Sequence, residues 1–280
     1  MLLFSKMQGT GNDFIIINCL NQFFNYNLNI LSKFLCNRNF GIGADGVIYI
    51  FQSSIADYKM RIFNSDGSEA EMCGNGIRCL GKYLYEKNIT LKTELKIETL
   101  AGIKDIELNF QNKSVFGVRV KMGKPIFDSE KIPVFLPKTV QNSEPCEVSI
   151  KLDNTEYKFS LVSIGNPHAV CFVKDLNKIN IFKFGPKVEN YKYFPTKTNV
   201  EFVQIIDRNN IKIKVWERGA GNTISCGTGA CASVACGVKH DFVDKNVTAI
   251  LDGGKLHINY IDDIFMSGPA EFVFEGRIDL

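Results

Sequence analysis

The amino-acid sequence predicts an α+β protein made of two similar halves, and two observations support that prediction. The segments Tyr58–Arg78 and Ile211–Cys231 match without a gap, and each contains one Cys-Gly-x-Gly tetrapeptide, at Cys73 and Cys226. A Gly-Asn pair lies far upstream of each tetrapeptide, at nearly the same distance in both halves. Short Gly-rich matches arise by chance, but an ordered set of landmarks that recurs at one spacing indicates duplication of a single α/β unit.

Each half begins with strand patterns. The Gly-Asn pairs open two apolar runs, at residues 13–18 and 167–173. Further along, residues 58–63 and 211–216 alternate apolar with basic side chains, which is the period of a half-buried strand. Polar, Gly-containing loops then lead to the two tetrapeptides. We therefore expect strands, loop and cysteine in the same order in both halves.

A helix is expected directly after each Cys-Gly-x-Gly. Ile77, Leu80 and Leu84 recur at the spacing of one helical face. The second helix is almost entirely small or apolar, a composition typical of a buried helix that packs closely against strands. Between the halves lies a β-rich stretch with turns at 123–125 and 135–137, so the boundary is expected near residue 120.

Composition and charge exclude several classes of protein. The 33 basic and 30 acidic residues leave a net charge of +3 without a basic stripe, so nucleic-acid binding is not expected. The N-terminus has no leader-like pattern and no run of about 18 apolar residues occurs, which predicts a cytoplasmic protein without a membrane partner. Nine cysteines cannot all pair, and none forms Cys-x-x-Cys, so neither a disulfide framework nor a metal site is expected.

A cysteine at the start of a helix is suited to acid–base chemistry. The unpaired N–H groups and the helix dipole favour the thiolate and lower the pKa of a thiol from about 8.5 towards neutrality. The same N–H groups can hold a carboxylate. Inversion of an amino-acid centre needs a base on one face of the carbon and an acid on the other. If the duplicated halves face each other across a cleft, Cys73 and Cys226 supply that pair.

No cofactor is expected. Neither tetrapeptide continues into the Lys-Ser/Thr of a P-loop, and neither has the Gly-x-Gly-x-x-Gly spacing of a dinucleotide site. The charge that develops on the substrate carboxylate would then be met by fixed N–H donors in a dry pocket.

Five segments resemble the diaminopimelate epimerase family, in the family's order along nearly the whole chain. They are Met-Gln-Gly-Thr-Gly-Asn-Asp-Phe (7–14), Phe-Gly-Ile-Gly-Ala-Asp-Gly (40–46), Phe-Asn-Ser-Asp-Gly-Ser-Glu-Ala-Glu-Met-Cys-Gly-Asn-Gly (63–76), Gly-Asn-Pro-His (165–168), and Glu-Arg-Gly-Ala-Gly followed by Ser-Cys-Gly-Thr-Gly-Ala (217–230). The resemblance implies two pseudo-symmetric domains, each a mixed sheet curled around a central helix, with the active site in the cleft between them. It also implies an isomerase that interconverts LL- and meso-2,6-diaminopimelate without pyridoxal phosphate, in lysine and peptidoglycan precursor biosynthesis.

The resemblance also assigns site residues. Cys73 and Cys226 would be the acid and base thiols. Backbone N–H groups would hold the reacting carboxylate at Gly74, Asn75, Gly227 and Thr228. The positions that match the family's substrate contacts are Asn12, Asn64, Asn166, Asn199, Glu217 and Arg218. Arg218 would bind the distal carboxylate and Glu217 the distal ammonium. His168 and Glu217 would assist the thiols.

The closing segment 268–276 resembles the family's last strand, which would return to the first half. The expected domains are therefore residues 1–120 plus 267–280, with Cys73, and residues 121–266, with Cys226. Two positions depart from the family pattern. Gln8 stands where the family often has His, and Asn222 where it often has Glu. Neither is an expected thiol or carboxylate ligand, so these departures concern loop detail more than activity.

Three alternative functions are left open. A proline or hydroxyproline racemase shares the two-thiol logic, but proline has no distal amino-acid group for Glu217 and Arg218 to bind. A thiol redox enzyme would cycle Cys73 and Cys226 through a disulfide, whereas we expect such oxidation to inactivate an epimerase. A non-catalytic amino-acid-binding protein would not need both thiols. The expected partner is a small-molecule substrate, and a homodimer is left open.

Overall fold

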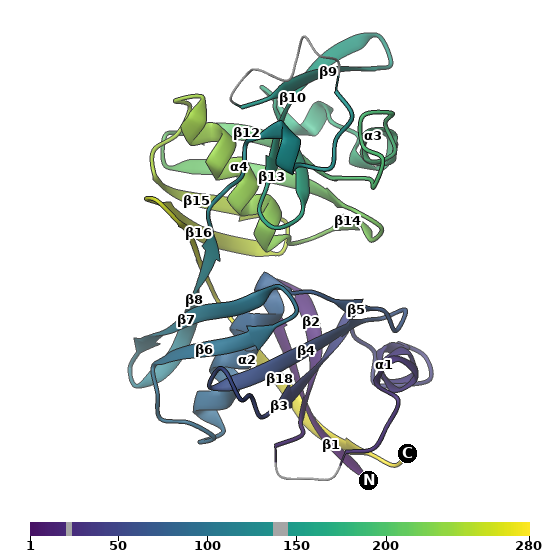
Figure 1. Ribbon diagram of the computed structural model, residues 1–280, viewed down its shortest axis with the longest axis vertical. Coiled ribbons are helices and arrows are strands. Elements are labelled where there is room, and N and C mark those ends of the chain that lie inside the picture. The colour runs from purple at the N-terminus through teal and green to yellow at the C-terminus, as the bar shows by residue number, and fades with distance from the viewer. Residues whose placement is uncertain (21–23, 137–144) are drawn as a thin grey trace. The chain divides into compact units, whose positions relative to one another are not determined.

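The computed structural model describes residues 1–20, 24–136 and 145–280 and divides the chain into two compact units. The first unit comprises Met1–Lys121 together with Ser267–Leu280, and the second comprises Met122–Met266. Figure 1 labels the elements of both units.

The first unit is a mixed sheet with two α-helices. Its elements are β1 (Leu2–Gly9), β2 (Asn12–Asn18), α1 (Leu28–Cys36), β3 (Gly46–Phe51), β4 (Tyr58–Asn64), β5 (Glu69–Ala70), α2 (Gly74–Glu86), β6 (Glu94–Thr99), β7 (Gly102–Gln111), most of β8 (Ser114–Gly123), and β18 (Glu271–Ile278). The strands pair in the order β18-β1-β2-β3-β4-β6-β7-β8, and β5 pairs with β4. The β2–β3 and β4–β6 pairs are parallel and the others are antiparallel.

The second unit repeats this plan. Its elements are η1 (Ser129–Lys131), β9 (Glu147–Leu152), β10 (Thr155–Ser163), β11 (Pro167–Phe172), η2 (Leu176–Lys178), α3 (Ile181–Glu189), β12 (Asn199–Asp207), β13 (Asn210–Glu217), β14 (Gly221–Thr223), α4 (Gly227–Lys239), β15 (Asn246–Leu251), β16 (Gly254–Tyr260) and β17 (Ile264–Gly268). The strands pair in the order β9-β10-β11-β12-β13-β15-β16, and β14 pairs with β13.

The predicted duplication is confirmed strand by strand. The series β1-β2-β3-β4-β6-β7 corresponds to β10-β11-β12-β13-β15-β16, and the parallel pairs fall at the same two places, β11–β12 and β13–β15. The helices α2 and α4 both have 13 residues and both follow a short strand, β5 or β14. The α+β class with two duplicated mixed-sheet halves is therefore the observed fold.

The central strands of the first unit are buried on both faces, because a helix covers each face. The helix α1 contacts β3 and β4, and α2 contacts β1, β2 and β7 (Figure 1). Successive side chains of a strand point to opposite faces. Val47 and Tyr49 share a core cluster with α1, whereas Ile48 faces α2, where a Cβ at Gly76 would come within 3.0 Å of its Cδ1. This double cover explains the unbroken apolar run Val47–Ile50.

The equivalent strand of the second unit differs at one buried position. Val200 and Phe202 of β12 lie in a core cluster with α3. Glu201, between them, points to the other face, where a Cβ at Gly229 of α4 would come within 2.7 Å of its Oε1. A carboxylate therefore occupies the place that Ile48 fills in the first unit.

The end of the chain returns to its beginning, as expected. The last strand, β18, pairs antiparallel with β1, and Ile278 lies opposite Leu2. The turn expected at 123–125 begins at Gly123, which has a φ of +96°. Pro137, in the other expected turn, lies outside the described residues. No helix among the described residues is long and apolar enough to cross a membrane.

Candidate active site

Two cysteines occupy equivalent positions at the starts of equivalent helices. Cys73 is the N-cap residue of α2, and Cys226 is the N-cap residue of α4. Both have extended backbone, with φ and ψ of −134° and 120° at Cys73 and −126° and 112° at Cys226. A helix start leaves N–H groups that its own carbonyls do not reach. The placement of Gly74, Asn75, Gly227 and Thr228 in these first turns agrees with the sequence-based expectation.

The thiol of Cys73 lies against an asparagine from β2. Its Sγ is 3.7 Å from Oδ1 of Asn12 and donates to it, and the same oxygen accepts from Nδ2 of Asn75 at 3.3 Å. Asn12 begins β2, whose pairing with β1 and β3 fixes its backbone. We call Asn12, Cys73 and Asn75 the Cys73 cluster.

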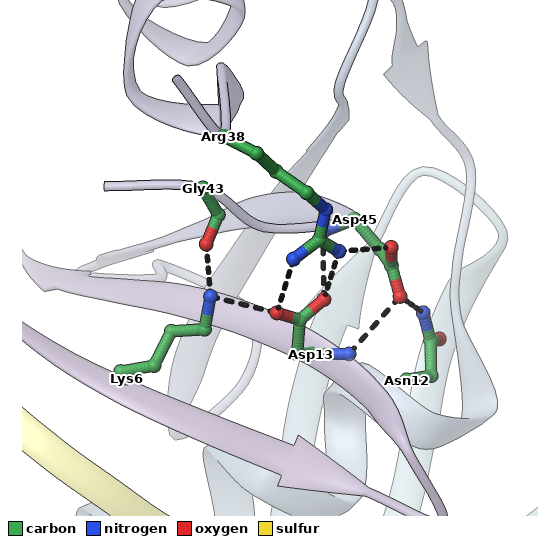
Figure 2. A network of polar contacts seen from close by, with 6 residues as sticks. All are labelled: Lys6, Asn12, Asp13, Arg38, Gly43 and Asp45. Carbon is green, nitrogen blue, oxygen red and sulfur yellow. Dashed lines mark hydrogen bonds and ion pairs between the residues drawn. The ribbon is translucent and has the colours of Figure 1, made fainter. Parts of the chain in front are cut away.

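A network of charged residues holds Asn12 from its other side (Figure 2). Nδ2 of Asn12 donates to Oδ2 of Asp45 at 2.7 Å. Arg38 donates to Asp45 at 2.9 Å and also, through two nitrogens, to the carboxylate of Asp13. Lys6 pairs with Asp13 at 2.7 Å and donates to the carbonyl of Gly43. The amide of Asn12 is thereby oriented with its oxygen towards Cys73.

Asn64 is not bonded to the Cys73 cluster in the described structure. It ends β4 and its Nδ2 donates to Oγ of Ser68 at 3.0 Å, which closes a turn at 64–68. Its counterpart Glu217 ends β13, so the two residues are equivalent in the duplicated fold, as the sequence predicted. An amide in one half and a carboxylate in the other break the symmetry at this position.

The thiol of Cys226 is buried among hydrogen-bonding groups. Its Sγ accepts from the N–H of Gly229 at 3.4 Å and lies 3.5 Å from Oγ1 of Thr228. Glu217 also hydrogen-bonds to this thiol, and its Oε1 accepts from Thr223 at 2.6 Å. The carboxyl group expected to receive the distal ammonium of a substrate thus contacts the thiol itself. We call Cys226, Glu217, Glu201 and His168 the Cys226 cluster.

The expectation of a thiolate at Cys226 is wrong for this structure. Burial raises the pKa of Cys226 well above its ordinary value, and the negative charges of Glu217 and Glu201 raise it further. The hydrogen bonds from Thr228 and Gly229 lower it, but by less. Burial also raises the pKa of Glu217. Desolvation and two carboxylates therefore outweigh the helix start, and Cys226 is a protonated thiol, the form of a proton donor.

The ring nitrogens of His168 lie within hydrogen-bond distance of a second carboxylate and of an asparagine. Its Nδ1 is 2.7 Å from Oε1 of Glu201, and its Nε2 is 2.9 Å from Oδ1 of Asn166. Both His168 and Glu201 have side chains that are 0% exposed. The structure thus joins the expected residues Asn166 and His168 directly, and it adds Glu201, which the sequence analysis did not single out.

Asn199 supports the loop that carries Arg218. Its Nδ2 donates to the carbonyl of Pro167 at 2.9 Å, and its Oδ1 accepts from the backbone N–H of Arg218 at 3.0 Å. Glu189, on α3, accepts from the next N–H, that of Gly219, at 2.9 Å. The nitrogen and the oxygen of the Asn199 side-chain amide both bond to backbone groups, so Asn199 fixes the backbone from which Arg218 projects.

Sequence reasoning missed two residues that hydrogen-bond to expected site residues, Asp45 to Asn12 and Glu201 to His168. Asp45 lies in the segment 40–46, and Glu201 lies among the apolar residues Val200, Phe202 and Val203, where a carboxylate is unusual. That anomaly is the signal that could have flagged Glu201. Among the residues that the structure describes, no group of three or more His, Cys, Asp or Glu side chains could hold a metal ion.

Comparison with known proteins decides the family. A family model described as diaminopimelate epimerase matches residues 4–127 and 160–273. The chain belongs to the diaminopimelate epimerase family. Diaminopimelate epimerases of Methanococcus maripaludis and Acetivibrio thermocellus are 48% and 47% identical to it over 280 residues, which cover 99% of this chain and 99% and 98% of those proteins. The resemblance to the diaminopimelate epimerase family seen in five short segments is thus confirmed along the whole chain.

Solved structures with the same fold include proteins outside the diaminopimelate epimerase family. A hydroxyproline epimerase from Agrobacterium vitis aligns with a TM-score of 0.71 at 14% identity, covering 98% of this chain and 91% of that one. A phenazine biosynthesis protein from Bacillus anthracis aligns with a TM-score of 0.68 at 16% identity, covering 100% and 99%. At such identities the likeness shows the fold alone.

Proposed function

We propose that this member of the diaminopimelate epimerase family interconverts LL- and meso-2,6-diaminopimelate, using Cys73 and Cys226 on opposite faces of one α-carbon. One observation supports it most strongly: two cysteines are the N-cap residues of equivalent helices in a duplicated fold. One thiolate removes the α-proton, the electron pair passes onto the carboxylate, and the other thiol returns a proton on the opposite face. The two sulfurs then have exchanged protonation states.

The backbone around each cysteine has a role in this scheme. The N–H groups of Gly74, Asn75, Gly227 and Thr228 hold the reacting carboxylate and stabilise the charge that develops on it. No cofactor is needed if these donors meet that charge in a water-excluded site.

The remaining site residues divide between substrate and thiols. Arg218 binds the distal carboxylate through its planar fork of donors, and Asn199 holds the backbone beneath it. Asn12 and Asn166 contact the substrate near the thiols, and Asn64 contacts it from the end of β4. Glu217 has two tasks, since it hydrogen-bonds to the thiol of Cys226 and also supplies charge for the distal ammonium.

The starting protonation states follow from burial and charge. Because its pKa is raised, Cys226 begins as the proton donor. His168 is held by Glu201 and Asn166 and acts on the thiols through these contacts. A cytoplasmic location, a step in lysine and peptidoglycan precursor biosynthesis, and a homodimer remain part of this proposal.

The decisive experiment compares Cys73→Ala and Cys226→Ala with the wild type in D₂O. Each variant should epimerise diaminopimelate at least about a thousandfold more slowly, because each removes one partner of a two-base reaction. Cys79→Ala and Cys236→Ala, which change buried cysteines within the same two helices, should keep the activity. Full epimerisation by either active-site variant would disprove the two-thiol scheme.

The shared fold with a hydroxyproline epimerase makes that activity the second candidate. Proline and hydroxyproline should be tested for α-proton exchange beside diaminopimelate. Exchange of the α-proton of proline or hydroxyproline, but not of diaminopimelate, would overturn the choice of substrate and would leave the two-thiol mechanism in place. We expect oxidation of Cys73 and Cys226 to a disulfide to abolish activity, and epimerisation by the disulfide form at the rate of the reduced protein would contradict the two-thiol mechanism.

A further inference from the structure

Glu201 is a buried carboxylate that folding alone does not explain. Its side chain is 0% exposed, and one of its oxygens, Oε2, has no hydrogen-bond partner within the described residues. Leaving a buried polar atom without a hydrogen-bond partner destabilises the folded protein, and does so more strongly if the group is charged. Oε1 is satisfied by Nδ1 of His168 at 2.7 Å.

The first unit shows that the fold does not require this pair. In β2–β3, Phe14 lies opposite Gly46, and in β11–β12, His168 lies opposite Asn199. Gly46 and Asn199 are the first residues of the equivalent strands β3 and β12, so His168 is the counterpart of Phe14. Ile48 and Glu201 each lie two residues further along these strands and are likewise counterparts. Phe14 and Ile48 are as buried as His168 and Glu201, with 2% and 0% of their surface exposed. Apolar replacements for buried ion pairs are often neutral or stabilising.

The carboxylate lies directly behind the reacting sulfur. A Cβ at Gly229 would meet Oε1 of Glu201 at 2.7 Å and Sγ of Cys226 at 3.3 Å, so only a glycine fits between them. The titratable groups around Glu201 are His168 on β11, Glu217 on β13, and Cys226 and Cys236 on α4. In the first unit an isoleucine side chain occupies the same place behind Cys73.

We propose that Glu201 is a positioning residue for the epimerisation, with two effects. Its carboxylate anchors the His168 ring through Nδ1, and it places a buried negative charge behind Cys226 that holds this sulfur as a thiol. The proposal deepens and rests on the proposed function. The duplicated fold is symmetric, so two identical half-sites would carry identical thiols. A charge present behind only one of them makes one cysteine the donor and leaves the other to be the base.

The test begins with Glu201→Gln, which removes the charge and keeps an acceptor for Nδ1 of His168. We expect kcat for epimerisation to fall about tenfold to a hundredfold, with KM changed less than about threefold. Alkylation of Cys226 by iodoacetamide, followed by peptide mass spectrometry, should reach half its maximal rate at a lower pH than in the wild type. A purely structural role would change neither this midpoint nor kcat.

Two further variants keep the test decisive. Glu147→Gln is the matched control, because Glu147 also lies beside a histidine of the second unit, with 3.6 Å between its Oε1 and Nε2 of His240. Glu147→Gln should change neither kcat nor the pH midpoint of Cys226 alkylation. Glu201→Ile introduces the residue of the first unit and should unfold at the wild-type temperature or above, with the same early alkylation of Cys226.

The outcomes separate the inference from the function on which it rests. Wild-type kcat together with an unshifted alkylation midpoint in Glu201→Gln would overturn the inference, while the wild type still epimerises diaminopimelate. A wild-type protein that leaves diaminopimelate unchanged would overturn the proposed function, even if the alkylation midpoint shifts and supports the placement of charge behind Cys226.

Discussion

The Sγ of Cys73 lies 3.7 Å from Oδ1 of Asn12 and donates a hydrogen bond to it. The two residues are far apart in sequence, but Asn12 is the first residue of β2, Cys73 is the N-cap residue of α2, and β2 and α2 pack against each other. Asp45 holds the other end of the Asn12 amide at 2.7 Å, so the orientation of the amide oxygen does not depend on the thiol. The polar partner of Cys73 is therefore preorganised.

The first prediction concerns this contact. Asn12→Ala removes the acceptor beside Cys73 and should lower kcat/KM for epimerisation about tenfold to a hundredfold, the effect of losing one or two well-placed hydrogen bonds. Asn18→Ala, the same substitution at the other end of β2, is the matched control and should stay within about twofold of the wild type. Steady-state kinetics on diaminopimelate decide between them, and equal rates for both variants would remove Asn12 from the site.

The second prediction concerns Glu217, whose loss should slow the enzyme and stabilise the fold. Burial raises the pKa of this carboxyl group, so ionising it costs more in the folded protein than in the unfolded chain. A carboxyl group whose pKa is raised by folding destabilises the folded protein once the pH rises above the pKa that the group has in the unfolded chain. The reason is that the group ionises more easily in the unfolded chain. Glu217→Gln avoids that cost and should unfold at a higher temperature than the wild type at pH 7.

The stability gain of Glu217→Gln should disappear below about pH 4, where the wild-type carboxyl group is protonated in both states. Epimerisation by the same variant should fall about a hundredfold or more, because its amide no longer carries the charge beside Cys226. Thermal unfolding scans at several pH values and activity assays provide both measurements. A variant that is less stable at pH 7 would contradict this account of Glu217.

The third prediction concerns the network in Figure 2. Burial raises the pKa of Asp13, but hydrogen bonds and charges from Arg38 and Lys6 outweigh it and lower the pKa to about 2. A carboxyl group whose pKa is lower in the folded protein than in the unfolded chain stabilises the fold at pH values above its unfolded pKa. This contribution is lost as the pH falls through the folded pKa. Because solvent partly screens the carboxylate, we expect a contribution of about 1 kcal/mol.

Asp13→Asn should therefore lose stability at pH 6, and the difference from the wild type should shrink by about 1 kcal/mol between pH 5 and pH 2. Urea unfolding at each pH measures this difference. Asp105→Asn, at an exposed carboxylate on β7, is the control and should show a constant, small difference. A pH-independent deficit in Asp13→Asn would show that the network acts through packing and not through charge.

Much of the fold could be predicted from sequence because the duplication is written in short-range patterns. The alternation at residues 58–63 and 211–216 marks strands, and the Cys-Gly-x-Gly motifs mark helix starts, so local patterns were enough to place Cys73 and Cys226 at N-caps. The equivalence of Asn64 and Glu217 also follows from the gapless match. These features depend on local backbone preferences and on a period of two or of 3.6 residues.

The surroundings of the thiols could not be predicted in this way. Glu201 reaches Cys226 only because β12 pairs with β11 and presents alternate side chains to α4. The sequence-based expectation of a thiolate rested on the helix start alone, and burial of Cys226, together with carboxylates from two other strands, reverses it. Likewise, Asp45 meets Asn12 through the parallel pairing of β2 and β3.

The order of residues along the chain is enough to show that there are two copies of one unit, that each copy places a cysteine at a helix start, and that the chain resembles a family of epimerases. Which charges surround each sulfur is settled only when the strands pair. The physical reason is that a pKa depends on desolvation and on charges within a few ångströms, and strand pairing brings those groups together from distant parts of the chain. The same helix start therefore has an isoleucine behind Cys73 and a carboxylate behind Cys226.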